Sequence, residues 1–248
     1  MERFSKSIVF SLFNKQKVVP KLPLSVDIHS HLLSRLDDGV KSLAEAEDVI
    51  IDLLEMGFKK LITTPHIMSD TYRNEPQGIQ KELDELKSHL TKKGINMEMQ
   101  AAAEYYLDEF LYTRIINKES LLTFGDKYLL FETNFISEPL QMKEFIFQAS
   151  SQGYRLVLAH PERYGYMTME KAEDFRNRGV LFQLNSLSIG GAYSKSVQKM
   201  AIQLIDKGWV DFLGSDCHNR IQSKMLQSLQ ESRHYQKACS LPLLNNTL

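Results

Sequence analysis

The chain lacks the features that stabilise or anchor several classes of protein. Its 248 residues include two cysteines, Cys217 and Cys239, which is too few for a disulfide framework and is typical of a reducing cytoplasm. Its formal net charge is −1, so no global positive field attracts nucleic acid or an anionic membrane. No apolar run is long enough to span a bilayer. No glycine-rich phosphate loop follows the first predicted strand, which argues against a nucleotide-binding sheet. Neither cysteine begins a Cys-x5-Arg phosphate loop, which argues against a cysteine-based phosphatase.

The first residues differ from the rest of the chain. We predict an N-terminal extension, residues 1–24, followed by a single domain, residues 25–248. The apolar run Ser7–Phe13 in this extension is flanked by lysines, and no small-residue cleavage site follows it. We expect the extension to pack on the domain or to fray. Binding to a membrane surface or to another subunit is the alternative, because apolar residues beside lysines suit both.

Seven short apolar runs alternate with seven amphipathic segments along the domain. The runs have the continuous hydrophobicity of parallel strands buried on both faces, and the segments have apolar residues at helical spacing. The predicted strands are 26–29, 60–64, 95–103, 128–131, 155–159, 180–184 and 210–213, and the predicted helices are 43–56, 77–93, 108–116, 139–152, 169–178, 194–207 and 221–235. The pattern is α/β, either a closed barrel or an open doubly wound sheet, and seven regular units favour the barrel.

Every predicted strand except the sixth ends in histidine, aspartate or glutamate. Because the carboxyl ends of the strands in a β/α fold share one mouth, we expect these side chains to meet there. Singly, each has another explanation: Glu104 or Glu132 could begin a helix favourably, and His66 could be a turn residue after Pro65. Together, six such strand ends indicate a polynuclear metal site, with the predicted ligands His29, His31, Asp38, His66, Glu104, Glu132, His160, Asp216 and His218.

The ligand set indicates the kind of metal. Strand alternation predicts that Asp27, His29 and His31 share one face, and the nine ligands offer only nitrogen and oxygen, which suits manganese, iron or zinc. Nine ligands are too many for one ion and are enough for two or three divalent ions with bridging carboxylates. Three such ions beside four carboxylates would leave the pocket positive and attract an anion. Cys217 lies between two predicted ligands, and alternation turns its thiol away from the site.

Two arginines indicate that this anion is a phosphate. Arg163 follows His160 by three residues, and arginine both matches phosphate oxygens bidentately and stabilises charge on a transferring phosphoryl group. We expect Arg163 to be catalytic and to bind substrate; the alternative is a surface arginine paired with Glu162. Arg220, two residues after His218, is a second candidate for substrate binding.

These motifs, in this order, resemble the polymerase-and-histidinol-phosphatase (PHP) superfamily, and within it the bacterial metal-dependent protein-tyrosine phosphatases of capsular and exopolysaccharide operons. The resemblance runs from about Val26 to Arg220 and rests on Asp27–His31, Asp37–Gly39, Thr64–His66, Glu104, Phe131–Glu132, Ala159–Tyr164 and Ser215–Asn219. It implies a distorted seven-stranded (β/α)7 barrel and a trinuclear centre that usually holds manganese or iron. It also implies a substrate, the tyrosine-rich tail of a polysaccharide-export tyrosine kinase.

The resemblance assigns roles to individual residues. The nine predicted ligands fall on the family's metal ligands, and Arg163 falls on its catalytic arginine. Two features depart from the family pattern. The family's second arginine lies several residues after the His-Asn pair, whereas Arg220 follows that pair at once, and the extension before Val26 is absent from the shortest members.

The predicted function is that of a metal-dependent phosphomonoesterase, and specifically a protein-tyrosine phosphatase, in which a metal-activated water attacks phosphorus in line. A phenolate leaving group, with a pKa of about 10, suits this chemistry. The alternatives are a phosphatase for histidinol phosphate or another small molecule, a phosphodiesterase for nucleic acid, and a non-catalytic metal-stabilised partner of a kinase or membrane complex. Near-neutral charge argues against nucleic acid, and Arg163 argues against a non-catalytic role. We expect a cytoplasmic protein, peripheral to the inner membrane through its partner; the sequence leaves open whether it forms an oligomer.

Overall fold

The computed structural model describes residues 24–248. The prediction for the N-terminal extension, including the apolar run Ser7–Phe13, therefore lies outside the described residues. Within residues 24–248, no helix combines the length and the apolarity required to cross a bilayer.

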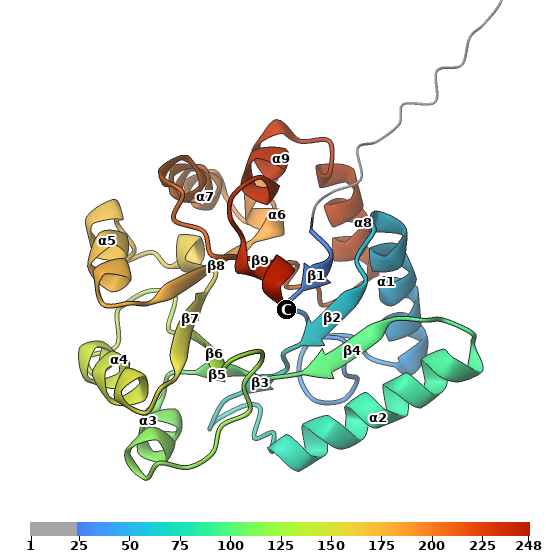
Figure 1. The fold of residues 1–248 in the computed structure, drawn as a ribbon, viewed down its shortest axis with the longest axis horizontal. Coiled ribbons are helices and arrows are strands. Elements are labelled where there is room, and N and C mark those ends of the chain that lie inside the picture. The colour runs from blue at the N-terminus through green and yellow to red at the C-terminus, as the bar shows by residue number, and fades with distance from the viewer. Residues whose placement is uncertain (1–23) are drawn as a thin grey trace, which may run out of the picture.

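The strands form one curled parallel arrangement made of two hydrogen-bonded sheets (Figure 1). The smaller sheet has the order β1-β2-β4, and the larger has the order β3-β5-β6-β7-β8-β9. Every pairing between these strands is parallel, as the β/α alternation predicts. Their bounds are β1 Val26–Asp27, β2 Lys60–Thr63, β3 His66–Ile67, β4 Glu98–Ala101, β5 Glu104–Tyr106, β6 Tyr128–Glu132, β7 Arg155–Ala159, β8 Leu181–Asn185 and β9 Phe212–Gly214.

The strand count differs from the predicted seven because two strands are each interrupted. Thr64 and Pro65 separate β2 from β3, and Ala102 and Ala103 separate β4 from β5. Pro65 has no backbone N–H to donate to a ladder, which is a physical reason for the first break. The two breaks lie side by side, since β2 pairs with β4 and β3 pairs with β5. The breaks directly precede His66 and Glu104, the first residues of β3 and β5, and so help to set the direction in which these two side chains enter the site.

Backbone contacts also join the first and last strands beyond their regular parts. Ser30 and Cys217 form an isolated parallel bridge, and His31 N donates to Cys217 O at 2.9 Å. Asp216 N in turn donates to His29 O at 2.8 Å. The segments that carry the first two and the last two predicted ligands are therefore direct neighbours.

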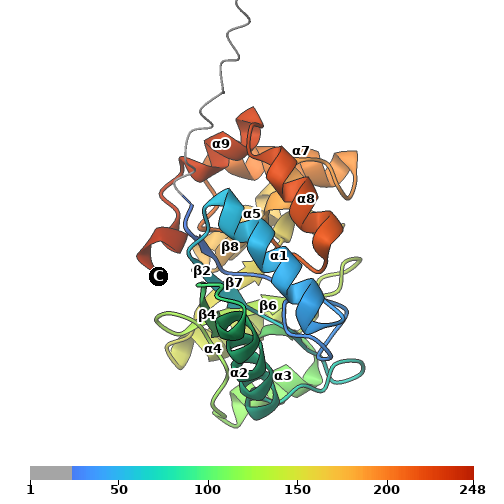
Figure 2. The ribbon, with the colours of Figure 1, turned by 90° about the vertical axis from the view of Figure 1, so that its right-hand side faces the viewer.

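Helices surround the strands (Figures 1 and 2). Several begin where predicted because a side chain accepts from a first-turn N–H, as Ser42 does in α1 and Ser194 in α7. The helices are α1 Leu43–Met56, α2 Pro76–Lys92, α3 Glu109–Ile116, α4 Met142–Ser151, α5 Met169–Asn177, α6 Ser186–Ile189, α7 Lys195–Lys207, α8 Arg220–Leu229 and α9 Arg233–Cys239, with 3-10 turns at Pro161–Arg163 and Leu244–Thr247. The predicted last helix, 221–235, is thus two helices, and the break allows Tyr235 to be fully buried.

Apolar side chains fill the inside of the curled sheet, below the strand ends. Val26, Ile28, Ile62 and Phe212 belong to this inner cluster, which is distinct from the larger core between the strands and the helices. The C-terminal 3-10 turn packs there as well, near the centre of Figure 1. Asn245 Nδ2 donates to Val26 O at 2.9 Å and to Leu213 O at 2.8 Å, so one side chain joins β1 and β9.

Candidate metal centre

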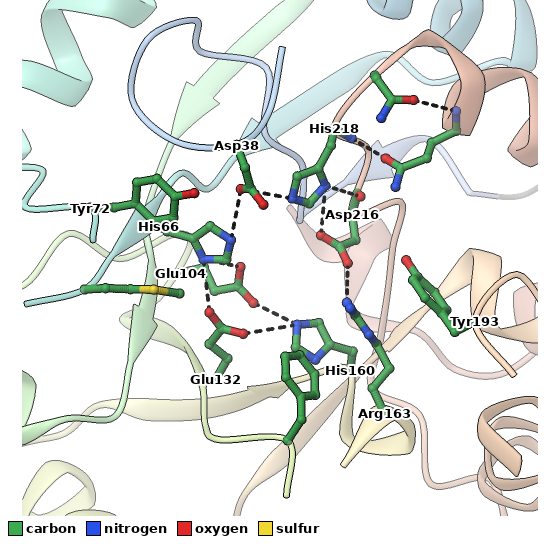
Figure 3. A pocket seen from close by; sticks show the side chains of 14 residues that line it. Asp38, His66, Tyr72, Glu104, Glu132, His160, Arg163, Tyr193, Asp216 and His218 are labelled. Atoms are coloured by element: carbon green, nitrogen blue, oxygen red, sulfur yellow. Dashed lines mark hydrogen bonds and ion pairs between the residues drawn. The ribbon is translucent and has the colours of Figure 1, made fainter. Parts of the chain in front are cut away.

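Nine histidine and carboxylate side chains meet at the carboxyl ends of the strands, and Figure 3 shows those that line the pocket. They form four overlapping groups, in each of which the ligand atoms lie within 4.8 Å of one another: His31, Asp38, His66 and His218; His29, His160 and Asp216; His29, His31 and Glu104; and His66, Glu104 and Glu132. Every predicted ligand belongs to at least one group. The structure therefore brings the complete predicted set together, although their coordination of metal stays a prediction.

His29 and His31 lie at the bottom of this cluster. Their Nε2 atoms are 3.3 Å apart, and His29 Nε2 lies 3.1 Å from Glu104 Oε2. Asp27, which strand alternation predicts on the same face, belongs to none of the four groups. Asp27 instead accepts hydrogen bonds from the backbone N–H and the hydroxyl of Ser215, at 2.8 and 2.6 Å. Asp27 thus supports the segment that leads to Asp216.

Glu104 lies at the centre of the cluster. It is fully buried in β5, and its Oε1 lies 2.9 Å from His160 Nε2. Its Oε2 lies 3.1 Å from His66 Nδ1, and Glu132 Oε1 lies 3.0 Å from the same nitrogen. Both carboxylates are in strands, so the alternative that either begins a helix is wrong, and His66 begins β3 rather than a turn.

Asp38 and His218 stand at the solvent side of the same cluster. Asp38 Oδ1 lies 3.6 Å from the Nε2 atoms of both His66 and His218. The loop that carries Asp38 approaches closely because of Gly39, where an added Cβ would lie 2.2 Å from the carbonyl oxygen of His31. The Asp37-Asp38-Gly39 motif therefore requires glycine at its third position for a steric reason.

Hydrogen bonds at the far ring nitrogens orient three of the histidines. His29 Nδ1 bonds Gln183 Oε1 at 2.7 Å, His31 Nδ1 bonds Asp37 Oδ2 at 2.7 Å, and His218 Nδ1 bonds the Asp216 carbonyl at 2.8 Å. Such partners fix the ring orientation and leave Nε2 free for a ligand role. Sequence reasoning missed Gln183, although a signal existed: it is a polar residue within the apolar run that forms β8.

Charges within the cluster shift several pKa values. Burial alone would raise the pKa of Glu104, but His29 and His66 beside it hold that pKa well below its usual range. Asp216 behaves in the same way, since burial is outweighed by His29 and His31. Burial opposes protonation of His29, yet Glu104 and Asp216 raise its pKa to about 9. These carboxylates therefore depend on nearby positive charge to stay ionised, and a metal cation would also supply such charge.

The cluster also holds polar atoms without suitable partners. Within residues 24–248, Glu104 Oε2, Glu132 Oε1, His66 Nδ1 and His160 Nδ1 are buried and make no hydrogen bond of acceptable geometry. Buried polar groups are normally satisfied, so each such atom needs an explanation. Glu104 Oε2 and Glu132 Oε1 lie 3.1 and 3.0 Å from His66 Nδ1, and lone pairs that converge in this way fit a cation placed between them.

Arg163 reaches the same pocket from a sharp turn. His160 has a φ of 34°, and the following 3-10 turn brings Arg163 Nη1 to 2.9 Å from Asp216 Oδ2. The alternative, a surface pair with Glu162, is wrong: Glu162 is buried, and its Oε1 accepts from Asn185 N at 3.1 Å. Arg163 is 23% exposed and lines the pocket, where its guanidinium lies beside Asp216 (Figure 3).

Arg220 does not line the pocket. It begins α8, is 53% exposed, and its Nη1 donates to Asp48 Oδ2 of α1 at 2.9 Å. The first turn of α8 points this side chain outward, across the helix pair α1 and α8. The prediction that Arg220 binds substrate therefore finds no support in its position.

The pocket has a volume of about 450 Å³ and a second, less polar part that sequence reasoning missed. Met68, Tyr72, Phe135 and Tyr193 contribute to its walls. Asn185 Nδ2 links this part to the polar part, because it bonds both Asp216 Oδ2 at 2.7 Å and the Tyr193 hydroxyl at 2.9 Å. The wall residues come from loops, where no periodicity marks them, whereas Asn185 directly follows the sixth predicted strand and ends β8.

Cys217 is where alternation predicts it. Its side chain is buried, and its Sγ donates to Asn219 O at 3.4 Å, away from the ligand groups. Burial raises the pKa of the Cys217 thiol, so it is not a thiolate nucleophile.

Comparison with known proteins gives a consistent result. A family model described as capsular polysaccharide synthesis, CpsB/CapC, matches residues 25–238. The chain is 28% identical over 200 residues to tyrosine-protein phosphatase YwqE of Bacillus subtilis, covering 78% of this chain and 77% of that protein. It is 24% identical over 201 residues to tyrosine-protein phosphatase CpsB of Streptococcus agalactiae, covering 78% of this chain and 83% of that protein.

A solved structure is similar as well. It belongs to a study of YwqE from Bacillus subtilis and CpsB from Streptococcus pneumoniae, which are described there as metal-dependent tyrosine phosphatases. The TM-score is 0.75 at 25% sequence identity, and the match covers 85% of this chain and 89% of the other. The match to the family model spans most of the chain, from the segment that carries His29 to helix α9. The chain therefore belongs to the CpsB/CapC family of capsular polysaccharide synthesis.

Proposed function

We propose that this protein is a metal-dependent protein-tyrosine phosphatase. One observation carries the proposal: nine histidine and carboxylate side chains form one cluster at the strand ends, and seven of them line a single pocket together with Arg163. Relatives of the same family are named tyrosine-protein phosphatases, and the similar solved structures are described as metal-dependent. Such a reaction needs cations and a guanidinium for the phosphate oxygens, which the ligand set and Arg163 would supply.

The described residues fit a centre of two or three divalent ions. The donors are imidazole and carboxylate alone, the set that suits manganese, iron or zinc, and we assign manganese first. The buried lone pairs without hydrogen-bond partners support cations at these positions. The residues that would hold these ions are His29, His31, Asp38, His66, Glu104, Glu132, His160, Asp216 and His218, and within this set Glu104 and Asp216 each lie near several histidines.

Divalent ions in such a site supply a water nucleophile at neutral pH and positive charge at the phosphate oxygens. The side chains of the protein bind and orient the phosphate group. Arg163 donates N–H groups to the equatorial oxygens, where negative charge is spread in the transition state. Asp216 and Asn185 hold Arg163 in place through Asp216 Oδ2, which accepts from both. A tyrosine phenolate leaves readily, since its pKa of about 10 is far below that of an alkoxide, so the site requires no strong acid.

The substrate follows from this leaving group and from the family. We assign phosphotyrosine in proteins as the substrate class and the tyrosine-rich tail of a polysaccharide-export tyrosine kinase as the partner. The curled sheet supports assignment to the distorted (β/α)7 barrel of the PHP type, with the two interrupted strands each filling one barrel position. A cytoplasmic location, at the inner membrane through the kinase, fits a free and buried pair of cysteines.

The test compares three substrates with protein that has been stripped of metal and reloaded with Mn²⁺. A phosphotyrosine peptide, a phosphoserine peptide of the same sequence and histidinol phosphate are each assayed for released phosphate. We expect turnover of the phosphotyrosine peptide to exceed the others and to require the metal. Preference for histidinol phosphate would replace the proposed substrate, and absence of turnover on all three in metal-loaded protein would refute the enzyme assignment.

A further inference from the structure

The pocket wall beside Arg163 is aromatic. Phe135 lies in the loop between β6 and α4, and Tyr193 lies in the loop between α6 and α7; they are 41% and 37% exposed. The guanidinium carbon of Arg163 lies 4.9 Å from the ring centroid of Phe135 and 4.3 Å from that of Tyr193. A phosphate bonded to Arg163 therefore has both rings within reach of the group esterified to it.

Both rings are fixed in place although they are exposed. Phe135 stacks on His160 with centroids 5.7 Å apart, contacts Tyr164 at 5.5 Å, and its carbonyl accepts from Gly165 N at 2.7 Å. The Tyr193 hydroxyl accepts from Asn185 Nδ2. Large aromatic side chains held rigidly with open surface in a pocket lose little entropy when a ligand covers them, which favours binding there.

The opposite wall of the pocket also carries an aromatic ring stacked on a histidine of the cluster, but this ring is not beside Arg163. Tyr72 stacks on His66 with centroids 5.6 Å apart and an interplanar angle of 13°. In Figure 3 it lies across the pocket from Arg163 and Tyr193. A substrate group attached to a phosphate held by Arg163 is accordingly closer to the wall of Phe135 and Tyr193 than to Tyr72.

We propose that Phe135 and Tyr193 form the subsite for the aromatic ring of the substrate and select aryl over alkyl phosphomonoesters. This inference rests on the proposed phosphatase function and adds the residues that set its specificity. A planar ring can stack against Phe135 or pack edge-on against Tyr193, and it covers apolar surface that water otherwise contacts. A short alkyl chain has no π-face and less area, so it gains little from the same wall.

The test measures binding, so that it does not depend on turnover. Phenylphosphonate and methylphosphonate share an anionic head and are not hydrolysed, and their dissociation constants are measured by calorimetry with Mn²⁺-loaded protein. We expect wild-type protein to prefer phenylphosphonate. Phe135→Ala should reduce this preference by roughly threefold to tenfold, the value of one aromatic contact. The matched control is Phe147→Ala, since Phe147 is 67% exposed on α4 and does not line the pocket; it should keep the wild-type preference.

The outcomes separate the two proposals. If Phe135→Ala weakens both ligands equally, the ring only positions Arg163, and the inference is overturned. If the alanine variant fails to fold, the same preference is measured in Phe135→Leu, which retains apolar volume, and in Tyr193→Leu. A wild-type preference for phenylphosphonate in both leucine variants would also overturn the inference. Hydrolysis of a phosphotyrosine peptide is assayed in parallel on wild-type protein, so that lack of turnover counts against the proposed function alone.

Discussion

Replacement of Arg163 by alanine should lower kcat far more than it raises KM. Arg163 lies beside the ligand cluster in the same pocket, and a guanidinium has five N–H donors, of which one is bonded to Asp216. The remaining donors are available to the equatorial phosphate oxygens. Loss of one such preorganised contact costs about 10²–10³ in kcat. KM should change less, because charge on these oxygens develops most strongly in the transition state.

The structure also predicts what this substitution leaves intact. Asp216 Oδ2 keeps its bond from Asn185 Nδ2 at 2.7 Å, so the carboxylate retains its orientation without Arg163. Metal content should therefore equal that of wild-type protein. Arg163→Lys should restore only part of the activity, because a point charge does not reproduce the planar fork of the guanidinium.

The assay is steady-state hydrolysis of 4-nitrophenyl phosphate and of a phosphotyrosine peptide, with metal content measured by mass spectrometry on the same samples. Arg178→Ala is the matched control, since Arg178 pairs with Asp174 at the end of α5 and lies outside the pocket. Two results would refute the reasoning: wild-type kcat in Arg163→Ala, or a loss of activity that disappears once metal occupancy is restored.

Three further perturbations address the remaining features of the site. Chelation should abolish hydrolysis and Mn²⁺ should restore it; full activity in protein shown to be metal-free would end the metal hypothesis. Cys217→Ser should leave turnover largely intact, because the buried thiol points away from the ligands. Burial of the serine hydroxyl should lower the free energy of unfolding by roughly 1–3 kcal/mol. A loss of orders of magnitude in kcat would show that the sulfur takes part in the reaction. Arg220→Ala should leave kcat and KM close to wild type and cost about 0–1 kcal/mol of stability, since its partner is Asp48 across an exposed helix pair; a large rise in KM would reinstate it as a phosphate ligand.

The parallel α/β pattern and the cluster of polar residues could be predicted from the sequence, because both depend on the order of apolar runs and of the polar residues that follow each run. Apolar runs give strands, and parallel strands have a common carboxyl end, so His160 and Asp216 were placed together without any knowledge of distance. Helices such as α1 and α7 have caps at both ends, and their bounds were predicted closely. These features need only neighbouring residues and a known chain direction.

Other features depend on three-dimensional contacts that no periodicity encodes. The breaks within the second and third predicted strands follow from paired kinks in adjacent strands, and the outward direction of Arg220 follows from the phase of α8 relative to α1. Phe135 and Tyr193 lie in loops, and their position beside Arg163 depends on how two distant loops fold. Gln183 could have been found, because a buried strand seldom carries a polar residue without a partner.

The contact between the first and last strands has a consequence for folding. His29 and Asp216 are far apart in the chain, so closing the seam between their segments carries the largest loop-closure entropy of the sheet. The side chain of Asn245 bonds both Val26 and Leu213, and the ribosome synthesises Asn245 after all nine predicted metal ligands. During synthesis this seam therefore closes only after Asp216 and Asn245 have emerged from the ribosome. A cation held by residues of both segments would stabilise the closed seam and would thereby couple metal binding to the last step of folding.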